Sequence, residues 1–197
     1  MMNTEQPSIK AILGLGNPTP ELFQTRHNMG HLCVELLGNQ KKLKFLSERF
    51  LDVAEWSLGT ELIIVSKSRT YMNQSGLAVL DLVRKFGFNP DEIAIVYDDM
   101  DLPLGKLRIK KEGSSGGHRG LSSVINSLGS NEFPRLRFGI GHPMKENVVD
   151  YVLGTFTKKD VCLVDKILHL GIEALEMMCL NGLDIVMNRY NGETITS

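Results

Sequence analysis

Short aliphatic runs alternate with helix-like patterns along this chain, and this alternation restricts its fold more than any other feature. Strands are predicted where β-branched and aliphatic residues cluster between polar or glycine-containing stretches. These runs cover residues 9–15, 61–67, 92–99, 106–111 and 135–141. Apolar residues recur with a helical period over residues 27–38, 75–87, 119–129 and 157–180. The first three predicted helices each end at a glycine, a common helix stop.

Strands that alternate with helices are typical of α/β domains, in which helices cover both faces of the sheet. We therefore predict an α/β fold with a mixed, mostly parallel, twisted sheet flanked by helices on both faces. A chain of 197 residues suits one hydrophobic core, and it contains no repeat, linker or low-complexity tract. Residues 1–197 are predicted to form a single domain.

Composition excludes several classes of protein. The 42% apolar and 23% charged residues are ordinary for a globular protein and exclude a wholly disordered chain. The longest apolar runs fall far short of the roughly 20 residues that span a bilayer. The first ten residues, MMNTEQPSIK, lack the charged and apolar regions of a secretory signal. No membrane partner is predicted.

Cysteine usage indicates a reducing compartment. The chain has three cysteines, an odd number, and Cys33, Cys162 and Cys179 are widely spaced within apolar stretches. This pattern favours reduced thiols in the core of a cytoplasmic protein over disulfides or a zinc site.

Positive charge is concentrated in one part of a chain whose net charge is only −1. Residues 106–137 contain seven basic residues against Glu112 and Glu132, a local excess of +5. The basic residues are Lys106, Arg108, Lys110, Lys111, Arg119, Arg135 and Arg137. Such an excess favours a face that binds an anion. The alternative is a solvated strand edge whose lysines oppose aggregation.

Polar or glycine-rich segments follow four of the predicted strands. They read GNPTPELFQTRHN, SRTYMNQSG, YDDMDLPLG and EGSSGGHRG. Ligands of α/β sheets bind beyond the carboxyl ends of strands, so these segments together predict a composite site.

Neither glycine-rich segment matches a nucleotide-binding motif. The run GLGNPT at residues 14–19 lacks the third glycine of a dinucleotide fingerprint, and Pro18 and Pro20 interrupt the expected helix start. EGSSGGHRG, residues 112–120, lacks the Lys-Ser/Thr pair of a P-loop. A nucleotide-dependent oxidoreductase therefore has only GLGN in its favour.

His27 is the candidate base. His27 and His31 have the spacing of metal ligands, but Asn28 stands where a zinc protease has its glutamate, and no third ligand is evident. No metal is predicted. His27 lies in TRHN, at a junction between a loop and a helix. A helix N-terminus disfavours the imidazolium, so a neutral histidine could act as a base there.

Asp98 is the first acid after the aliphatic part, residues 92–97, of the strand predicted at residues 92–99, and it is the acid expected to reach a site at the carboxyl edge of the sheet. A carboxylate beside His27 would fix its tautomer and stabilise the imidazolium formed when it takes a proton from water. Asp99 and Asp101 are interpreted as solvated turn acids.

Asn17 and Asn73 follow strands in tight polar contexts, GNP and YMNQSG. Asparagines in loops usually stabilise turns. Two of them near a base could instead bind a carbonyl and its developing oxyanion.

Taken together, these segments resemble bacterial-type peptidyl-tRNA hydrolases. The resemblance rests on LGLGNPTPELFQTRHNMG, KSRTYMNQSG and VYDDMDLPLGKLRIKKEGSSGGHRGL, and it extends through FPRLRFGIGHP and DYVLGTF. It covers nearly the whole chain in order. The combination of GNP, TRHN, TYMNQSG and DLPLG is highly specific, although each motif alone would be weak.

The resemblance implies an enzyme that hydrolyses the ester between a peptide, or an N-blocked amino acid, and tRNA, which frees the tRNA for translation. It implies a cytoplasmic monomer with no metal, organic cofactor or obligate protein partner, acting on the acceptor end of peptidyl-tRNA. His27 would activate water and Asp98 would keep it basic. Asn17 would distinguish N-blocked from free aminoacyl-tRNA, and Asn73 with neighbouring amides would bind the carbonyl.

The resemblance also implies contacts with tRNA. The matching positions are Leu22, Tyr71, Asn73, Lys110, Arg119 and Arg137. Two of them depart from the family: Leu22 replaces a usual tyrosine, with Phe23 adjacent, and Arg119 replaces a usual asparagine. We hypothesise that Arg119 contacts a tRNA phosphate; the alternative is a solvent-facing arginine in a first helical turn.

A different function is also open, that of a family relative that has lost catalysis and serves as an RNA-binding factor. This alternative stays open because Arg119 replaces an asparagine that is usual in the family. The joint presence of His27, Asp98, Asn17 and Asn73 favours activity, because a binding module needs no base paired with an orienting acid.

Overall fold

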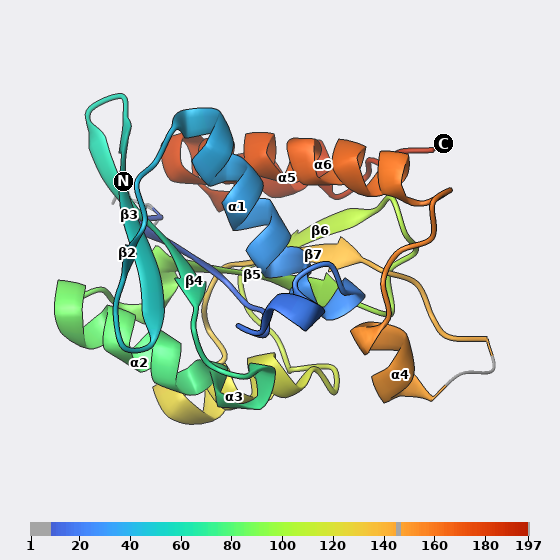
Figure 1. The fold of residues 1–197 in the computed structure, drawn as a ribbon. Helices are drawn as coiled ribbons and strands as arrows, with labels where there is room; N and C mark the ends of the chain where they lie inside the picture. The colour runs from blue at the N-terminus through green and yellow to red at the C-terminus, as the bar shows by residue number, and fades with distance from the viewer. Residues whose placement is uncertain (1–8, 145–146, 197) are drawn as a thin grey trace.

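The computed structural model describes residues 9–144 and 147–196 and contains a seven-stranded sheet (Figure 1). The strand order is β2-β3-β4-β1-β5-β7-β6. The strands are β1 (Ala11–Gly14), β2 (Leu46–Ser47), β3 (Leu51–Leu58), β4 (Glu61–Ser68), β5 (Ile93–Asp99), β6 (Leu107–Lys110) and β7 (Arg135–Gly139). Most of the N-terminal stretch that was searched for a signal, residues 1–8, lies outside the described residues.

The sheet is mixed, as predicted. Strands β4, β1, β5 and β7 pair in parallel, whereas β2–β3, β3–β4 and β6–β7 pair antiparallel. Parallel pairing therefore predominates only among the four central strands. Their carboxyl ends meet at one edge, which is where the predicted composite site should lie.

Helices cover both faces of the sheet, which confirms the predicted architecture. They are α1 (Met29–Lys41), α2 (Ser75–Phe86), α3 (Arg119–Leu128), α4 (Val148–Leu153), α5 (Val161–Asn181) and α6 (Leu183–Tyr190). Helices α1, α5 and α6 lie on one face, and α2 and α3 on the other (Figure 1). Each face carries its own cluster of buried apolar side chains.

Two strands and two α-helices were not predicted. Strand β3, LDVAEWSL, forms a hairpin with β4 along its whole length, but its interior charges Asp52 and Glu55 weaken its apolar pattern. Strand β2 spans only two residues at the sheet edge. Helix α4 has only six residues. Helix α6 is separated from α5 by Gly182, whose φ of +79° ends the longer helix α5.

The predicted helix at residues 27–38 is displaced in the structure. Residues Arg26–Asn28 form a separate 3-10 turn (η2), and α1 begins at Met29 and continues past Gly38 to Lys41. Gly38 does not end the helix; it makes room for Phe45, whose Cε2 would lie 2.5 Å from a Cβ at this position. Helices α2 and α3 do end at Gly87 and Gly129.

The glycines of the GLGN run serve close packing. A Cβ on Gly16 would lie 2.4 Å from Cγ of His31, and one on Gly14 would lie 2.4 Å from the carbonyl oxygen of Gly30. The chain after β1 forms a 3-10 turn (η1, Pro20–Leu22), and the first helix begins only at Met29. This segment therefore lacks the strand–turn–helix geometry of a dinucleotide fingerprint.

The cysteines are only partly as predicted. Cys33 and Cys179 are buried, and burial raises the pKa of Cys179 to about 12, so its thiol stays protonated. Cys162 is exposed, so its prediction as a core thiol was wrong. Among the described residues, no helix combines the length and apolarity that crossing a membrane requires.

His31 is buried in neutral form between α1 and the sheet. The Ser68 hydroxyl donates to the carbonyl of Gly16, so the Nε2–H of His31 donates to Ser68 Oγ at 3.1 Å. Burial, and secondarily the charge of Lys67, lowers the pKa of His31 to about 4.

This burial predicts an acid-sensitive stability. A folded-state pKa below the unfolded value of 6.5 means that the unfolded chain binds the proton first, so stability falls as pH drops from 6.5 towards 4. The loss attributable to His31 should reach about 3 kcal/mol. Urea unfolding between pH 7 and pH 4.5 should show a shallower loss for His31→Gln than for the wild type. The exposed His169→Gln is the control, and equal losses in wild type and His31→Gln would contradict the prediction.

Candidate active site

A cavity of about 740 Å³ lies at the carboxyl ends of the central strands. Segments that follow β1, β4 and β5 line it at this edge, as predicted. The glycine-rich segment after β6 also lines it, but β6 runs antiparallel to β7, so this segment starts at the opposite edge of the sheet. All nine predicted site residues line it: Asn17, Leu22, His27, Tyr71, Asn73, Asp98, Lys110, Arg119 and Arg137. Helix α4 adds an apolar wall through Val148, Val149, Val152 and Leu153.

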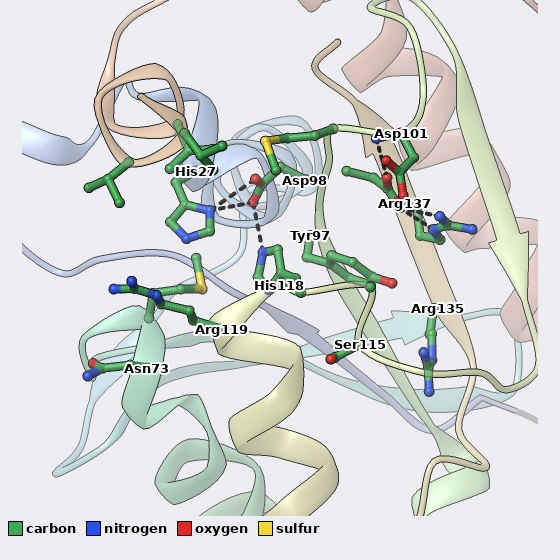
Figure 2. Close-up of a pocket in the computed structure, with 18 of the residues that line it drawn as sticks. His27, Asn73, Tyr97, Asp98, Asp101, Ser115, His118, Arg119, Arg135 and Arg137 are labelled. Atoms are coloured by element: carbon green, nitrogen blue, oxygen red, sulfur yellow. Dashed lines mark hydrogen bonds and ion pairs between the residues drawn. The ribbon is translucent and has the colours of Figure 1, made fainter. Parts of the chain in front are cut away.

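His27 and Asp98 form a buried pair in this cavity (Figure 2). Nδ1 of His27 lies 3.0 Å from both carboxylate oxygens of Asp98, and their side chains are 11% and 2% exposed. A carboxylate accepts hydrogen bonds only, so Nδ1 carries the hydrogen and Nε2 keeps its lone pair. The 3-10 turn that holds His27 is fixed by the bond from the N–H of Arg26 to the carbonyl of Gly154.

His118 is a third member of this cluster and was missed in the sequence. Its Nε2 lies 3.1 Å from Oδ1 of Asp98, and its Nδ1 accepts the backbone N–H of Leu121. His118 thereby caps the N-terminus of α3, and the acceptor role of Nδ1 places the hydrogen on Nε2. Its ring has no free lone pair, so His118 orients Asp98 and does not compete with His27 as a base. The available signal was its place as the histidine of EGSSGGHRG, directly before a predicted helix.

The two histidines keep Asp98 ionised. Burial alone would raise the pKa of Asp98, but the adjacent His27 and His118 outweigh it and hold this pKa well below its ordinary value. The carboxylate can therefore accept from both rings and oppose a positive charge that develops on His27.

His27, Asp98 and His118 also form the one group with metal-ligand chemistry among residues 9–144 and 147–196. Their ligand atoms lie within 4.8 Å of one another, but they already hydrogen-bond among themselves. A metal ion would have to replace both of these hydrogen bonds. His31, which has metal-ligand spacing from His27 in the sequence, bonds to Ser68 and does not join the group.

Hydrogen bonds hold Asn17 in an orientation that leaves its side-chain Nδ2–H free to donate to a ligand. Its backbone N–H and carbonyl are both bonded to the side chain of Asn28, at 2.8 and 3.0 Å. Its Oδ1 accepts the N–H of Met72 at 2.9 Å, which orients the amide. Among the described residues nothing accepts from its Nδ2, which is left as a donor in a residue that lines the cavity.

Tyr71 and Asn73 line the same cavity as Asn17 but come from the segment that follows β4. Tyr71 precedes a 3-10 turn (η3, Met72–Gln74), and both Tyr71 and Asn73 are exposed at the cavity. Met72 between them is buried and packs on Gly120, where a Cβ would lie 2.3 Å from its sulfur.

The basic residues occupy different environments. Arg137 forms a partly buried ion pair with Asp99, and their side chains are 14% and 11% exposed. The interpretation of Asp99 as a solvated turn acid was therefore wrong, whereas Asp101 is exposed. Arg119 is exposed and has no ion pair within the described chain. Figure 2 shows Arg119 and Asn73 on the same side of His118 as His27, with Arg135 and Arg137 on the other.

The glycine-rich loop, residues 112–118, joins β6 to α3 and forms part of the cavity wall. Gly113, Gly116 and Gly117 have φ values of +144°, +55° and +81°, which side chains rarely tolerate. The glycines of this loop therefore allow backbone turns that other residues would resist, and these turns place His118 beside Asp98.

The sheet, the cavity and the histidine–aspartate pair define the class of protein, an α/β protein with an acid–base pair at the carboxyl edge of its sheet. Comparison with known proteins gives the family. The family described as peptidyl-tRNA hydrolase matches residues 11–197. The chain belongs to this family.

Individual relatives agree over nearly the whole chain. A peptidyl-tRNA hydrolase of Persephonella marina is 40% identical over 190 residues, which is 95% of this chain and all of the relative. One of Pseudothermotoga lettingae is 44% identical over 185 residues, covering 93% and 97%. The crystal structure of peptidyl-tRNA hydrolase from Acinetobacter baumannii superposes with a TM-score of 0.91 at 30% identity, covering 98% of this chain and 99% of that one.

Proposed function

We propose that this protein hydrolyses the ester bond between a peptide, or an N-blocked amino acid, and tRNA, and so returns free tRNA to translation. The observation that carries the proposal is the buried His27–Asp98 pair, which leaves Nε2 of His27 as a base within a cavity. Membership of the peptidyl-tRNA hydrolase family supports this substrate.

In the first step, Nε2 of His27 takes a proton from a water molecule as the water oxygen attacks the ester carbonyl. The imidazolium that forms is stabilised by the ionised carboxylate of Asp98. The carbonyl oxygen becomes an oxyanion, and Asn73, exposed at the same cavity, is the proposed donor to it.

In the second step, the tetrahedral intermediate collapses and the bond between the carbonyl carbon and the ribose oxygen breaks. The imidazolium of His27 gives its proton to that ribose oxygen, which leaves as a hydroxyl, and the base is regenerated. Every proton taken from water is thus returned to a product. The rate should depend on His27 keeping its Nδ1–H directed at Asp98 throughout.

Asn17 is proposed to select N-blocked substrates. Its free Nδ2–H can donate to the carbonyl that acylates the substrate nitrogen, whereas a free α-ammonium offers no acceptor.

Replacing Asn17 with Ala should reduce the preference for N-acetylated over free aminoacyl-tRNA by about tenfold, because one neutral hydrogen bond is lost. The measurement is the ratio of kcat/KM for the two substrates. Asn17→Asp is the matched variant: it still accepts from Met72 N–H but offers a second acceptor in place of the donor. It should therefore favour the free ammonium. An unchanged ratio in both variants would refute the selective role.

Lys110, Arg119 and Arg137 are proposed to bind tRNA phosphates, with Leu22 and Tyr71 contacting the acceptor end. All five line the cavity. Arg119 and Lys110 are exposed and form no ion pair within the described chain, so both can gain by binding, whereas Arg137 is already paired with Asp99.

Arg119→Asn should flatten the salt dependence of tRNA binding. Each phosphate contact on a single strand contributes about 0.7 to the slope of log Kd against log salt concentration, so the slope should fall by about that amount. The slope is measured by titrating tRNA that carries no amino acid at several salt concentrations, and Arg119→Lys should keep the wild-type slope. An unchanged slope in Arg119→Asn would leave Arg119 as a solvent-facing arginine.

The function itself is tested by release of an N-acetylated amino acid from its tRNA. Turnover by the wild type is expected, with much slower release of a free amino acid. Tight tRNA binding without turnover would overturn the proposal in favour of a non-catalytic RNA-binding factor. We further propose that the protein acts as a cytoplasmic monomer with residues 1–197 as one domain, without metal or organic cofactor.

A further inference from the structure

Arg135 is a buried cation in the cavity wall whose burial the proposed reaction does not explain. It begins β7 and is 1% exposed, although arginine is almost never fully buried unless paired. Within the described ranges, 9–144 and 147–196, no carboxylate forms an ion pair with it. Other contacts must therefore offset the free-energy cost of removing the Arg135 guanidinium from water.

Those contacts include two backbone carbonyls, an aromatic ring and the side chain of Tyr97, while Nε of Arg135 has no hydrogen-bond partner among the described residues. Nη1 of Arg135 donates to the carbonyl of Ser114 at 2.9 Å, and Nη2 donates to that of Asn131 at 2.8 Å. The guanidinium carbon lies 4.4 Å from the centroid of the Phe133 ring. One planar group thus joins the glycine-rich loop to the turn that precedes β7, a geometry that a guanidinium fits and an ammonium does not.

The glycine-rich loop needs such an anchor. Its three glycines with positive φ values impose little conformational preference, so contacts must decide its shape. At one end, the N–H of Gly113 donates to the carbonyl of Asn131 at 3.3 Å, beside the bonds of Arg135. At the other end, His118 bonds to Asp98. The segment between these two attachments forms part of the cavity wall.

We propose that Arg135 is a positioning residue for the proposed reaction: it holds the carbonyl of Ser114 so that the glycine-rich loop keeps the cavity shaped for substrate. Arg135 does not reach the reacting atoms, since it lies on the far side of His118 from His27 (Figure 2). The His27–Asp98 pair comes from η2 and β5, outside the loop, and His118 at the far end of the loop is held by its own bonds to Asp98 and to the N–H of Leu121. Loss of the anchor should therefore weaken substrate binding more than the chemical step.

Two variants test this role, which rests on the proposed function. Arg135→Lys keeps the charge but has one nitrogen for two carbonyls, and Arg135→Met keeps an apolar stem against Phe133 without the donors. Both should raise KM for N-acetylated aminoacyl-tRNA about tenfold, the effect of a lost charge-assisted hydrogen bond, with kcat within about threefold of wild type. Arg189→Met is the control, since it removes an exposed arginine beside a ring on α6.

The possible results distinguish three effects: loss of the hydrogen bonds to the loop, loss of positive charge, and loss of the folded structure. A wild-type KM in Arg135→Lys with a raised KM in Arg135→Met would show that charge alone matters and would overturn the proposal. A fall confined to kcat would overturn it as well. If Arg135→Met does not fold, as judged by its thermal transition, Arg135→Lys alone decides between these outcomes.

Amide hydrogen exchange tests the anchor without substrate. The Gly113 and His118 amides bond to Asn131 and Ser115, and both should exchange about tenfold faster in the Arg135 variants, while amides of β5 keep their wild-type rates. Unchanged exchange at the loop would refute the anchor. Because this measurement needs no turnover, an inactive wild type would defeat the proposed function and still leave the anchor testable.

Discussion

His27→Ala is expected to lower kcat for N-acetylated aminoacyl-tRNA by about 10²- to 10⁴-fold, the range that a positioned general base contributes. The structure gives the reason. The Nδ1–H of His27 is bonded to Asp98, so in the neutral ring the lone pair is on Nε2. The other nearby ring, His118, has both nitrogens engaged and cannot substitute for it. KM should change little, because the residues proposed to contact tRNA lie elsewhere in the cavity.

The measurement is single-turnover release of the N-acetylated amino acid from its tRNA. His169→Gln is the control, because this exposed histidine of α5 lies outside the cavity. Added imidazole should restore part of the His27→Ala rate, since the truncated side chain leaves space at the cavity for a small base. Turnover that survives His27→Ala at the wild-type rate would refute the assignment of the base.

Asp98→Asn is expected to lower kcat by a similar factor, about 10²- to 10⁴-fold, through the tautomer of His27. Nδ1 of His118 must accept the N–H of Leu121, so its Nε2–H remains a donor and takes the one carbonyl oxygen of the new amide. The amide NH₂ then faces His27, which must accept at Nδ1 and carry its hydrogen on Nε2. The base is thereby lost while the geometry is kept.

This prediction is checked by kcat and by NMR of the histidine ring nitrogens, which reports the tautomer. Asp165→Asn, on the exposed surface of α5, is the control. If Asp98→Asn kept the wild-type rate, or if its His27 kept the hydrogen on Nδ1, the orienting role of Asp98 would be wrong.

Much of the fold was predictable because local sequence patterns determine it. The central strands β1, β4 and β5 contain aliphatic runs, and these strands and β7 are mostly buried; all four were predicted within a few residues. Helices α2 and α3 stop at glycines in the left-handed conformation, as predicted. Such features depend on side-chain hydrophobicity and backbone sterics within a few residues.

The elements that were missed depend on distant partners. Strand β3 carries Asp52 and Glu55, three residues apart and so on opposite faces of the sheet, and only its full pairing with β4 makes it a strand. Asp99 looked like a turn acid because its partner, Arg137, lies 38 residues away in the chain. Local pattern contains no information about either contact.

The site divides in the same way. The sequence alone determined that polar residues would gather at the carboxyl ends of parallel strands, because strand direction sets which loops meet. It also identified His27 and Asp98 as the base and acid to bring together. Only the tertiary structure decided that they touch across 71 residues, that His118 completes the cluster, and that Arg135 holds the glycine-rich loop. The physical reason is that hydrogen bonds act over about 3 Å and in defined directions. Strand register and helix packing, which position such groups across the chain, exist only in the folded molecule.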